Sequence, residues 1–240
     1  MIIAHRGASN LAPENTCASI KKAIELKADG IEIDIHLSKD NHIVVHHDYT
    51  TKRLSNKNFI IKDCTLAKLK EFEVGSHIGE EFKNEKIPTL NEILELLPNN
   101  IYLFIEIKSD KSILPFLNKE LEKFPELKNQ IFIIGFSKDV ALASKVLMKE
   151  IPFYFLYSNK ENEINTATLN ELINFCKSNN LEGLDLDWKL INQQVSSEIS
   201  KNDLKLYCWT VNNEIDAENL FKMGVHGITT DKPELFKQNK

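Results

Sequence analysis

The sequence is poor in the residues that mark several common kinds of functional site. Only 8 of its 240 residues are glycine, and no glycine-rich dinucleotide fingerprint follows a predicted strand. The four cysteines, Cys17, Cys64, Cys176 and Cys208, are widely spaced and form no paired motif for zinc or redox chemistry, so free thiols in a reducing compartment are expected. The chain also lacks a glycine-flanked serine elbow and a His-x-His pair of the kind that zinc hydrolases use.

Long apolar runs and an excess of basic residues are missing as well. The first apolar run, residues 1–3, reaches His5 and Arg6 too early for a signal peptide, and no run is long enough to span a bilayer. The chain has 30 Lys and Arg against 35 Asp and Glu, and its net charge of −5 argues against a non-specific nucleic-acid binder. We therefore expect a cytoplasmic protein with no nucleic-acid partner and no stable membrane insertion.

Short strands and amphipathic helices alternate along most of the chain. The spacing of apolar residues predicts a helix after Thr16, and Thr89–Glu92 and Thr168–Glu171 form capping-box patterns before two others. Strands are predicted at residues 1–3, 31–35, 102–107, 131–136, 153–157, 183–187, 205–211 and 226–229. Eight βα units in 240 residues predict an α/β protein of the closed (β/α)8 TIM-barrel class, with an open doubly wound sheet as the alternative.

One stretch interrupts this regular pattern. Residues 43–48 predict an additional short strand, and residues 49–86 are polar and irregular apart from an amphipathic patch near Leu66, Leu69 and Phe72. Excursions of this length are more often functional loops or small insertions than core elements. We expect one domain over residues 1–240 with a small insertion after the second strand, at about residues 36–86.

Acidic residues occupy the predicted second and third barrel strands. Glu32 and Asp34 are two residues apart in an alternating strand and therefore project from the same face, and Glu106 lies at the end of residues 102–107. Three converging carboxylates form an all-oxygen site that suits Mg2+ or Ca2+ better than zinc. Pairing of Glu32 and Asp34 with lysines on an exposed strand is the alternative, which the flanking isoleucines disfavour.

Two histidines at strand ends are the natural acid–base pair. One strand-end histidine alone is more often structural than catalytic, but His5 and His47 converge with the carboxylates and with Arg6. His46 should point away from the site, because neighbouring residues of a strand face opposite sides. The other histidines, His36, His42, His77 and His226, are expected in turns or before strands.

The remaining polar strand-end residues allow more than one interpretation. Lys108 either neutralises Glu106 or helps to bind a substrate anion. Trp209 is either a core residue or an apolar wall beside a substrate, and Glu14 is either a charge at a helix N-terminus or part of the site. Other polar side chains at predicted strand ends are Ser137, Asp185, Asp187, Asn212 and Asp231.

Taken together in chain order, these motifs resemble the glycerophosphodiester phosphodiesterase family, which belongs to the barrel superfamily of the phosphatidylinositol-specific phospholipases C. Each motif is weak alone, but the ordered set runs from residue 4 to about residue 235. The motifs are His5-Arg6-Gly7, Pro13-Glu14-Asn15-Thr16, Gly30-Ile31-Glu32-Ile33-Asp34, Val44-Val45-His46-His47-Asp48, Ile105-Glu106-Ile107-Lys108, Trp209-Thr210-Val211-Asn212 and Gly227-Ile228-Thr229-Thr230-Asp231.

The resemblance implies a function and a set of roles. It implies hydrolysis of deacylated phospholipids, such as glycerophosphocholine and glycerophosphoethanolamine, to sn-glycerol 3-phosphate and an alcohol. It also implies a divalent cation held by Glu32, Asp34 and Glu106, acid and base roles for His5 and His47, and phosphate contacts from Arg6 and Lys108. Trp209 is predicted as a further substrate-binding residue. Together with the seven residues just named, it completes the set of eight predicted site residues.

Several points remain open from the sequence. The nucleophile is either water or a hydroxyl of the substrate's own glycerol, and either histidine could be the acid. The same barrel could instead act on lipids as a lysophospholipase D or a phospholipase C, or bind a phosphorylated ligand without cleaving it. A monomer and a homodimer are both compatible with the sequence.

Overall fold

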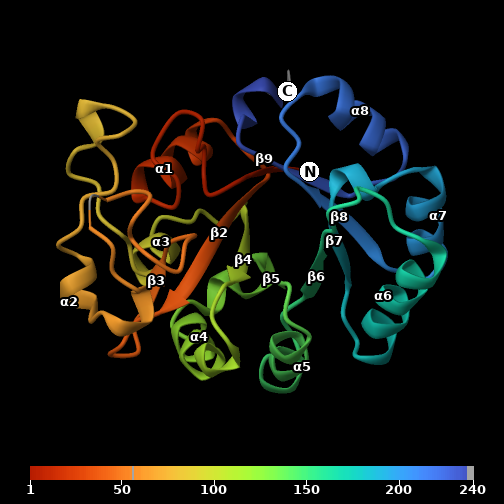
Figure 1. Ribbon diagram of the computed structural model, residues 1–240, viewed down its shortest axis with the longest axis horizontal. Helices are drawn as coiled ribbons and strands as arrows, with labels where there is room; N and C mark the ends of the chain where they lie inside the picture. The colour runs from red at the N-terminus through yellow and green to blue at the C-terminus, as the bar shows by residue number, and fades with distance from the viewer. Residues whose placement is uncertain (56, 237–240) are drawn as a thin grey trace.

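The computed structural model describes residues 1–55 and 57–236, in which parallel strands close into a barrel surrounded by helices (Figure 1). Asn56 and residues 237–240 of the expected domain lie outside the described residues. The barrel strands are β1 (Ile2–Ala4), β2 (Gly30–Leu37), β4 (Tyr102–Ile107), β5 (Ile131–Gly135), β6 (Phe153–Tyr157), β7 (Gly183–Asp187), β8 (Lys205–Trp209) and β9 (Gly227–Thr230).

The first strand closes the barrel. β1 pairs in parallel with β9 through Ile3 and Thr229, and in parallel with β2 through Ile3 and Gly30. The other barrel strands follow one another in parallel from β2 through β4 to β9. The structure therefore confirms the (β/α)8 barrel and excludes the open sheet.

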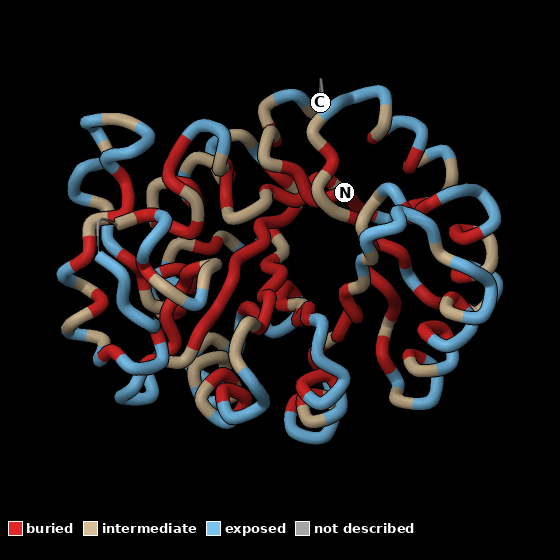
Figure 2. Tube along the Cα trace, viewed as in Figure 1, coloured by how far each residue is buried: buried red, intermediate tan, exposed pale blue. Residues whose placement is uncertain are grey.

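The helices lie outside the strands, with their exposed faces turned to solvent (Figure 2). They are α1 (Cys17–Glu25), α2 (Leu66–Leu69), α3 (Leu90–Leu94), α4 (Leu114–Leu121), α5 (Lys138–Leu147), α6 (Thr166–Ser178), α7 (Gln193–Lys201) and α8 (Glu214–Lys222). None of the helices in the described part of the chain combines the length and apolar character that a bilayer crossing requires.

Polar side chains cap the N-termini of the predicted helices, but one of the predicted capping residues is wrong. Thr16 and Thr89 cap α1 and α3 in capping boxes, the second with Glu92 as predicted. The predicted capping box of Thr168 with Glu171 is wrong, because α6 begins at Thr166 and Thr168 therefore lies inside the helix. Asn165 caps it by accepting a hydrogen bond from the Thr168 backbone N–H.

Strand β2 is longer than the alternating pattern predicted. It continues to Leu37 because β3 (Ile43–Val45) pairs with it antiparallel, with Leu37 opposite Ile43 and His36 opposite Val44. His36 is therefore a buried strand residue and does not lie in a turn, which corrects the expectation for that histidine. The strand predicted at residues 43–48 ends at Val45, so His46 and His47 follow it.

Alternating residues of the barrel strands divide the apolar core in two. Ile31, Ile33 and Ile35 belong to the large core between strands and helices, whereas Phe104 and Tyr207 belong to a smaller cluster that also contains Ile3, Ile134, Tyr154 and Leu156. In this smaller cluster the Tyr207 ring makes edge contacts with Phe104 and Tyr154, at centroid distances of 5.3 and 4.7 Å. Phe104 and Tyr207 lie two residues before Glu106 and Trp209 on their strands, and Ile134 and Leu156 of the same cluster line the cavity of the site.

The segment between β3 and α3, residues 46–55 and 57–89, is folded around a core of its own. It contains the 3-10 helices η1 (Ile61–Asp63) and η2 (Glu80–Phe82) and the short helix α2. Its buried side chains form a cluster with Val44 of β3: Leu54, Ile61, Cys64, Leu69, Phe72, Val74 and Ile87. We call this part of the molecule the β3–α3 segment.

Candidate active site

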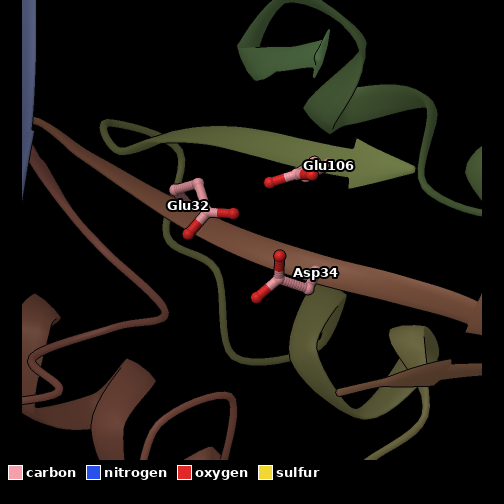
Figure 3. Close-up of side chains that lie close together, drawn as sticks. All are labelled: Glu32, Asp34 and Glu106. Carbon is pink, nitrogen blue, oxygen red and sulfur yellow. The ribbon is translucent and has the colours of Figure 1, made fainter. Parts of the chain in front are cut away.

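Three carboxylates meet where the middle of β2 lies beside the end of β4 (Figure 3). Glu32 and Asp34 project from one face of β2, and Glu106 lies opposite Asp34 in the parallel register. One ligand oxygen from each of the three lies within 4.8 Å of the others. All three residues are buried, which favours the metal-site interpretation over pairing with lysines on an exposed strand.

Burial and mutual repulsion give these carboxyl groups different proton affinities. Burial and the charges of Asp34 and Glu106 raise the pKa of Glu32 well above its usual range. Burial and Asp34 likewise raise the pKa of Glu106 to about 7, although Lys108 opposes the shift. Burial also acts to raise the pKa of Asp34, but the positive charges of Lys108 and Arg6 outweigh it and hold this pKa well below normal.

This donor set fits a hard divalent cation. The buried Oε1 of Glu32 has no hydrogen-bond partner within the described residues, and such an oxygen is costly to bury unpaired. The three ligands are all oxygens, the type that Mg2+ and Ca2+ prefer. A cation among them would also stabilise the ionised form of Glu32 and Glu106, whose raised pKa values mark the excess of negative charge.

Two cationic side chains surround Asp34. Arg6 Nε lies 3.2 Å from Asp34 Oδ2, and Lys108 Nζ lies 3.1 Å from Asp34 Oδ1. Lys108 Nζ also lies 2.6 Å from Glu106 Oε1. Lys108 therefore neutralises Glu106, as one sequence interpretation proposed, and it also faces the cavity beside it.

The turn after β1 holds Arg6 in place. Arg6 has a φ of +55° and Gly7 a φ of +80°. A Cβ at position 7 would lie 2.5 Å from Ser19 Oγ, so only glycine fits this close approach to α1. The turn aims the Arg6 backbone N–H at Glu32 Oε2, at a distance of 2.9 Å.

Asn15 is a site residue that sequence reasoning missed. Its side chain is buried, and it donates a hydrogen bond from Nδ2 to Asp34 Oδ2 at 2.8 Å. Its Oδ1 accepts a hydrogen bond from the Asp34 backbone N–H at 3.1 Å. This pair of bonds fixes the Asp34 carboxylate, and the Pro-Glu-Asn-Thr motif was the only signal in the sequence that could have indicated it.

His5 is oriented by an aspartate from the last barrel strand's end. His5 Nδ1 lies 2.6 Å from Asp231 Oδ1, and Asp231 also accepts hydrogen bonds from Asn212 Nδ2 at 2.7 Å and from Ser9 Oγ at 3.2 Å. Because a carboxylate can only accept, the proton lies on Nδ1 and leaves Nε2 free for proton exchange. His5 Nε2 is 3.9 Å from Glu32 Oε2.

His47 is oriented in the same way by a residue of the β3–α3 segment. Its Nδ1 lies 2.7 Å from Asp48 Oδ1. Burial, opposed by Asp34 and Asp48, lowers the pKa of His47. His46 is buried, with Nε2 3.2 Å from the Thr50 carbonyl oxygen, and does not line the inner cavity. Strand alternation is not the reason for this difference between the two histidines, because β3 ends at Val45.

Arg53 connects the two sides of this arrangement. Its Nε donates to Asp48 Oδ2 at 2.6 Å, and its two terminal nitrogens donate to Glu14 at 2.6 and 2.8 Å. Glu14 in turn accepts from Arg6 Nη1 at 2.9 Å. Glu14 is therefore part of the site, and Arg53 is a second residue that the sequence interpretation did not identify.

The site opens into two adjoining spaces. An inner cavity of about 220 Å3 at the barrel mouth is lined by seven of the eight predicted residues: His5, Arg6, Glu32, His47, Glu106, Lys108 and Trp209. Asp34 lies buried beside Arg6 and Lys108. An outer groove of about 460 Å3 is lined by His47, Glu106, Lys108 and Phe136, which it shares with the inner cavity, and by Tyr49 of the β3–α3 segment.

Trp209 is part of the cavity wall and is not enclosed in the core. Its ring makes an edge contact with Phe136 at a centroid distance of 5.8 Å, and its Nε1 donates to the Asp185 backbone oxygen at 3.4 Å. Asp185 and Thr229 also line the inner cavity. Burial and the charge of Glu106 raise the pKa of Asp185 well above its usual range.

Comparison with known proteins places this arrangement in context. A family model described as the glycerophosphoryl diester phosphodiesterase family matches residues 5–235. A glycerophosphodiester phosphodiesterase of Caldanaerobacter subterraneus is 36% identical over 238 residues, which cover 98% of this chain and 95% of that protein. One of Bacillus subtilis is 32% identical over 257 aligned residues, covering 100% of this chain and 86% of that protein.

Solved structures of similar proteins have the same fold as this chain. A phosphodiesterase of Oleispira antarctica, in complex with the product sn-glycerol-3-phosphate, is 28% identical and superposes with a TM-score of 0.83. The match covers 98% of this chain and 94% of that one. A glycerophosphodiester phosphodiesterase of Thermotoga maritima, at 24% identity and a TM-score of 0.79, has the same fold.

Proposed function

The chain belongs to the glycerophosphoryl diester phosphodiesterase family, and we propose that it hydrolyses glycerophosphodiesters such as glycerophosphocholine and glycerophosphoethanolamine to sn-glycerol 3-phosphate and an alcohol. One observation carries the proposal: two histidines, each held at Nδ1 by an aspartate, line the same cavity as Arg6, Lys108 and the carboxylates. The product bound to the Oleispira antarctica relative supports the same substrate class.

Glu32, Asp34 and Glu106 would hold a divalent cation, either Mg2+ or Ca2+. Such an ion, when bound, supplies positive charge that polarises a phosphoryl oxygen. Arg6 and Lys108 add fixed positive charge beside the same cavity and would bind the anionic phosphodiester. Contacts with the carboxylates hold the Arg6 and Lys108 side chains in position before substrate arrives, and Glu14 also holds Arg6. These two side chains therefore need little reorganisation when the substrate binds.

The two histidines would divide the proton transfers. A new bond forms between phosphorus and the attacking oxygen, which comes from water or from the substrate's glycerol hydroxyl, while the bond to the leaving alcohol breaks. If the glycerol hydroxyl attacks, the product of this step is a cyclic phosphate, and water then attacks phosphorus and breaks the new ring bond to give sn-glycerol 3-phosphate. One imidazole accepts the proton of the attacking oxygen at Nε2, and the other donates a proton from Nε2 to the leaving oxygen. Asp231 and Asp48 would stabilise whichever imidazole carries the extra proton.

We further propose one domain over residues 1–240, with an insertion at about residues 36–86, and a monomer or a homodimer. The separate apolar cluster of the β3–α3 segment supports the insertion. The four cysteines are free thiols, which supports a cytoplasmic location.

The proposal is tested by assaying the purified chain on glycerophosphocholine, glycerophosphoethanolamine and a micellar lysophospholipid. We expect release of sn-glycerol 3-phosphate from the soluble diesters, loss of activity on chelation, and recovery with Mg2+ or Ca2+. Full activity after exhaustive chelation would contradict the role of the carboxylates. Faster turnover of the lysolipid would favour the lipid-directed alternative, and ligand binding without product release would favour a non-catalytic barrel.

His5→Ala and His47→Ala test the acid–base assignment separately. Each variant should lower kcat by about 10²-fold to 10⁴-fold, the usual contribution of a general acid or base. Thermal unfolding checks that each variant is folded. His46→Gln is the matched control, because His46 is the neighbouring histidine and lies outside the cavity. The assignment fails if glycerophosphocholine turnover survives both substitutions.

A further inference from the structure

The inner cavity contains a carboxyl group that the proposed mechanism does not use. Asp185 is the third residue of β7 and lines the cavity, with 2% of its surface exposed. Its Oδ1 is buried and has no hydrogen-bond partner within the described residues. Trp209 donates to the backbone oxygen of Asp185 and so leaves the side chain unsatisfied.

No other contact in the described part of the chain accounts for the burial of the Asp185 carboxylate. Asp185 takes part in none of the ion pairs of residues 1–55 and 57–236, and it is not a member of the three-carboxylate cluster. An unsatisfied buried polar group costs about 1–3 kcal/mol. Such a cost is common where a ligand supplies the missing partner, so the position of Asp185 in the cavity wall points to a polar group of the ligand.

The position of the catalytic groups shows which part of a substrate would reach Asp185. His47, Glu106 and Lys108 line both the inner cavity and the outer groove, so the bond that breaks should lie at the junction of the two spaces. Asp185 lines the inner cavity but not the outer groove. At about 220 Å3 this cavity is smaller than the roughly 300–1,000 Å3 typical of drug-sized ligand sites, which suits the small glycerol phosphate.

We infer that Asp185 is a specificity-determining residue that hydrogen-bonds the terminal hydroxyl group of the substrate's glycerol, while the leaving alcohol occupies the outer groove. The inference rests on the proposed function. Ile134 and Leu156 line the same cavity and offer no polar side-chain atom, whereas Asp185 offers a buried carboxylate oxygen that no described residue hydrogen-bonds. A site that hydrogen-bonds a hydroxyl discriminates strongly against the analogue that lacks it, because the protein group is then left unpaired.

The test compares two diesters in the wild type and in Asp185→Ala. One is glycerophosphocholine, and the other is the phosphocholine diester of propane-1,2-diol, which lacks only the terminal hydroxyl and keeps the hydroxyl next to the phosphoester. We expect Asp185→Ala to lower kcat/KM for glycerophosphocholine by about 10-fold to 100-fold and to change kcat/KM for the deoxy diester less than about 3-fold. An equal fall with both diesters, or no fall with either, would overturn the inference.

Two further variants guard against a general effect on folding. Asp185→Asn keeps the shape and a hydrogen-bonding side chain, so it should retain part of the discrimination even if the alanine variant folds poorly. Asp187→Asn is the control on the same strand, because Asp187 accepts a hydrogen bond from the Lys189 backbone N–H and does not line the inner cavity. Its ratio of kcat/KM values for the two diesters should equal that of the wild type.

A binding measurement separates this inference from the proposed function. Calorimetry of sn-glycerol 3-phosphate and of propane-1,2-diol phosphate needs no turnover, and the wild type should bind the first about 10-fold to 100-fold more tightly. Asp185→Ala should lose this difference. If the wild type hydrolyses neither diester, the proposed function fails, whereas equal binding of the two phosphates by the wild type would overturn the role of Asp185.

Discussion

The two histidine arms of the site share one geometry but are held by different parts of the molecule. In the barrel arm, Asp231 lies 2.6 Å from His5 and is itself held by the neutral side chains of Asn212 and Ser9. In the segment arm, Asp48 lies 2.7 Å from His47 and is held by the charged side chain of Arg53. The barrel arm therefore depends on hydrogen bonds between barrel loops, and the segment arm on ion pairs.

The two histidines are therefore supported by interactions that respond differently to salt. Hydrogen bonds to neutral groups are insensitive to ionic strength, whereas ion pairs near solvent are screened by salt. The Arg53 side chain is 45% exposed, so its bonds should be the weaker support. The barrel would provide a rigid half of the site, and the β3–α3 segment a half whose position depends on a charged bridge back to Glu14 and Arg6.

Among the side chains that support the two histidines, the aspartates should matter most. Asp231→Ala and Asp48→Ala should both lower kcat by about 10-fold to 100-fold, because each leaves a catalytic imidazole without the group that orients it. The free energy of unfolding should separate them. Asp231→Ala leaves Asn212 Nδ2 without its acceptor and should lower the free energy of unfolding by about 1–3 kcal/mol, whereas Asp48→Ala should lower it by less than about 1 kcal/mol.

Steady-state kinetics and urea unfolding of both variants test this comparison. Asp203→Asn is a control, since Asp203 follows α7, lines neither the cavity nor the groove, and has a φ of +58° that asparagine tolerates. If Asp48→Ala were as destabilising as Asp231→Ala, the two arms would be structurally equivalent. If Asp48→Ala left kcat unchanged, Asp48 would not orient His47 in the active enzyme.

A smaller effect is expected at Arg53. Arg53→Met removes the bridge between Asp48 and Glu14, and we expect kcat/KM to fall by about 3-fold to 10-fold, as a bridge worth about 1 kcal/mol implies. Arg53→Lys should recover only part of this activity, because lysine cannot bind both carboxylates with a planar fork. The measurement is kcat/KM for glycerophosphocholine at low salt and at 1 M salt.

Salt distinguishes the bridge from a role of Arg53 in packing. The difference between the wild type and Arg53→Met should shrink at high salt, because the wild-type ion pairs are then screened. Lys83→Met is the matched control, since Lys83 forms an exposed ion pair with Glu80 in the same segment. A loss of activity that is unchanged in 1 M salt, or an equal loss in Lys83→Met, would contradict the proposed bridge.

Much of this architecture could be predicted from the sequence because it depends on local periodicity. The strands at residues 102–107, 153–157 and 183–187 have the predicted bounds, since a short, mostly apolar run between polar loop residues is a local property of the sequence. The convergence of Glu32 and Asp34 followed from their two-residue spacing. Trp209 lines the cavity and also packs against the smaller core cluster, so its position has features of both interpretations.

The residues that orient the site could not be predicted, because their contacts depend on barrel closure and on loop conformation. Asp231 meets His5 across 226 residues of sequence, and Arg53 meets Glu14 across 39. Asn15 reaches Asp34 from a backbone with a φ of +57°, which no apolar pattern indicates. Strand periodicity places the strand ends, whereas side-chain partners between distant loops require the closed barrel.

The smallest expected effect compares the two aspartates in acid. Burial acts to raise the pKa of Asp231, but His5, Asn212 and Ser9 outweigh it and lower this pKa to about 2. A carboxyl group with a lowered pKa in the folded state contributes stability above the unfolded pKa of about 3.9 and loses it as pH falls toward 2. Because the Asp231 side chain is 36% exposed, solvent screening reduces this contribution to less than about 1 kcal/mol.

Urea unfolding at pH 5 and at pH 2.5 measures this contribution as the stability of the wild type minus that of Asp231→Asn. The difference should be larger at pH 5, because the asparagine variant has no carboxyl group to protonate. Burial acts to raise the pKa of Asp48, but Arg53 and His47 outweigh it and lower this pKa. For Asp48→Asn, the same subtraction should change less with pH, because the Arg53 side chain is 45% exposed and solvent screens its ion pair with Asp48. A pH-independent difference for Asp231→Asn would mean that Asp231 supports the barrel arm through its shape alone, and the charge of its carboxylate would then play no part in holding His5.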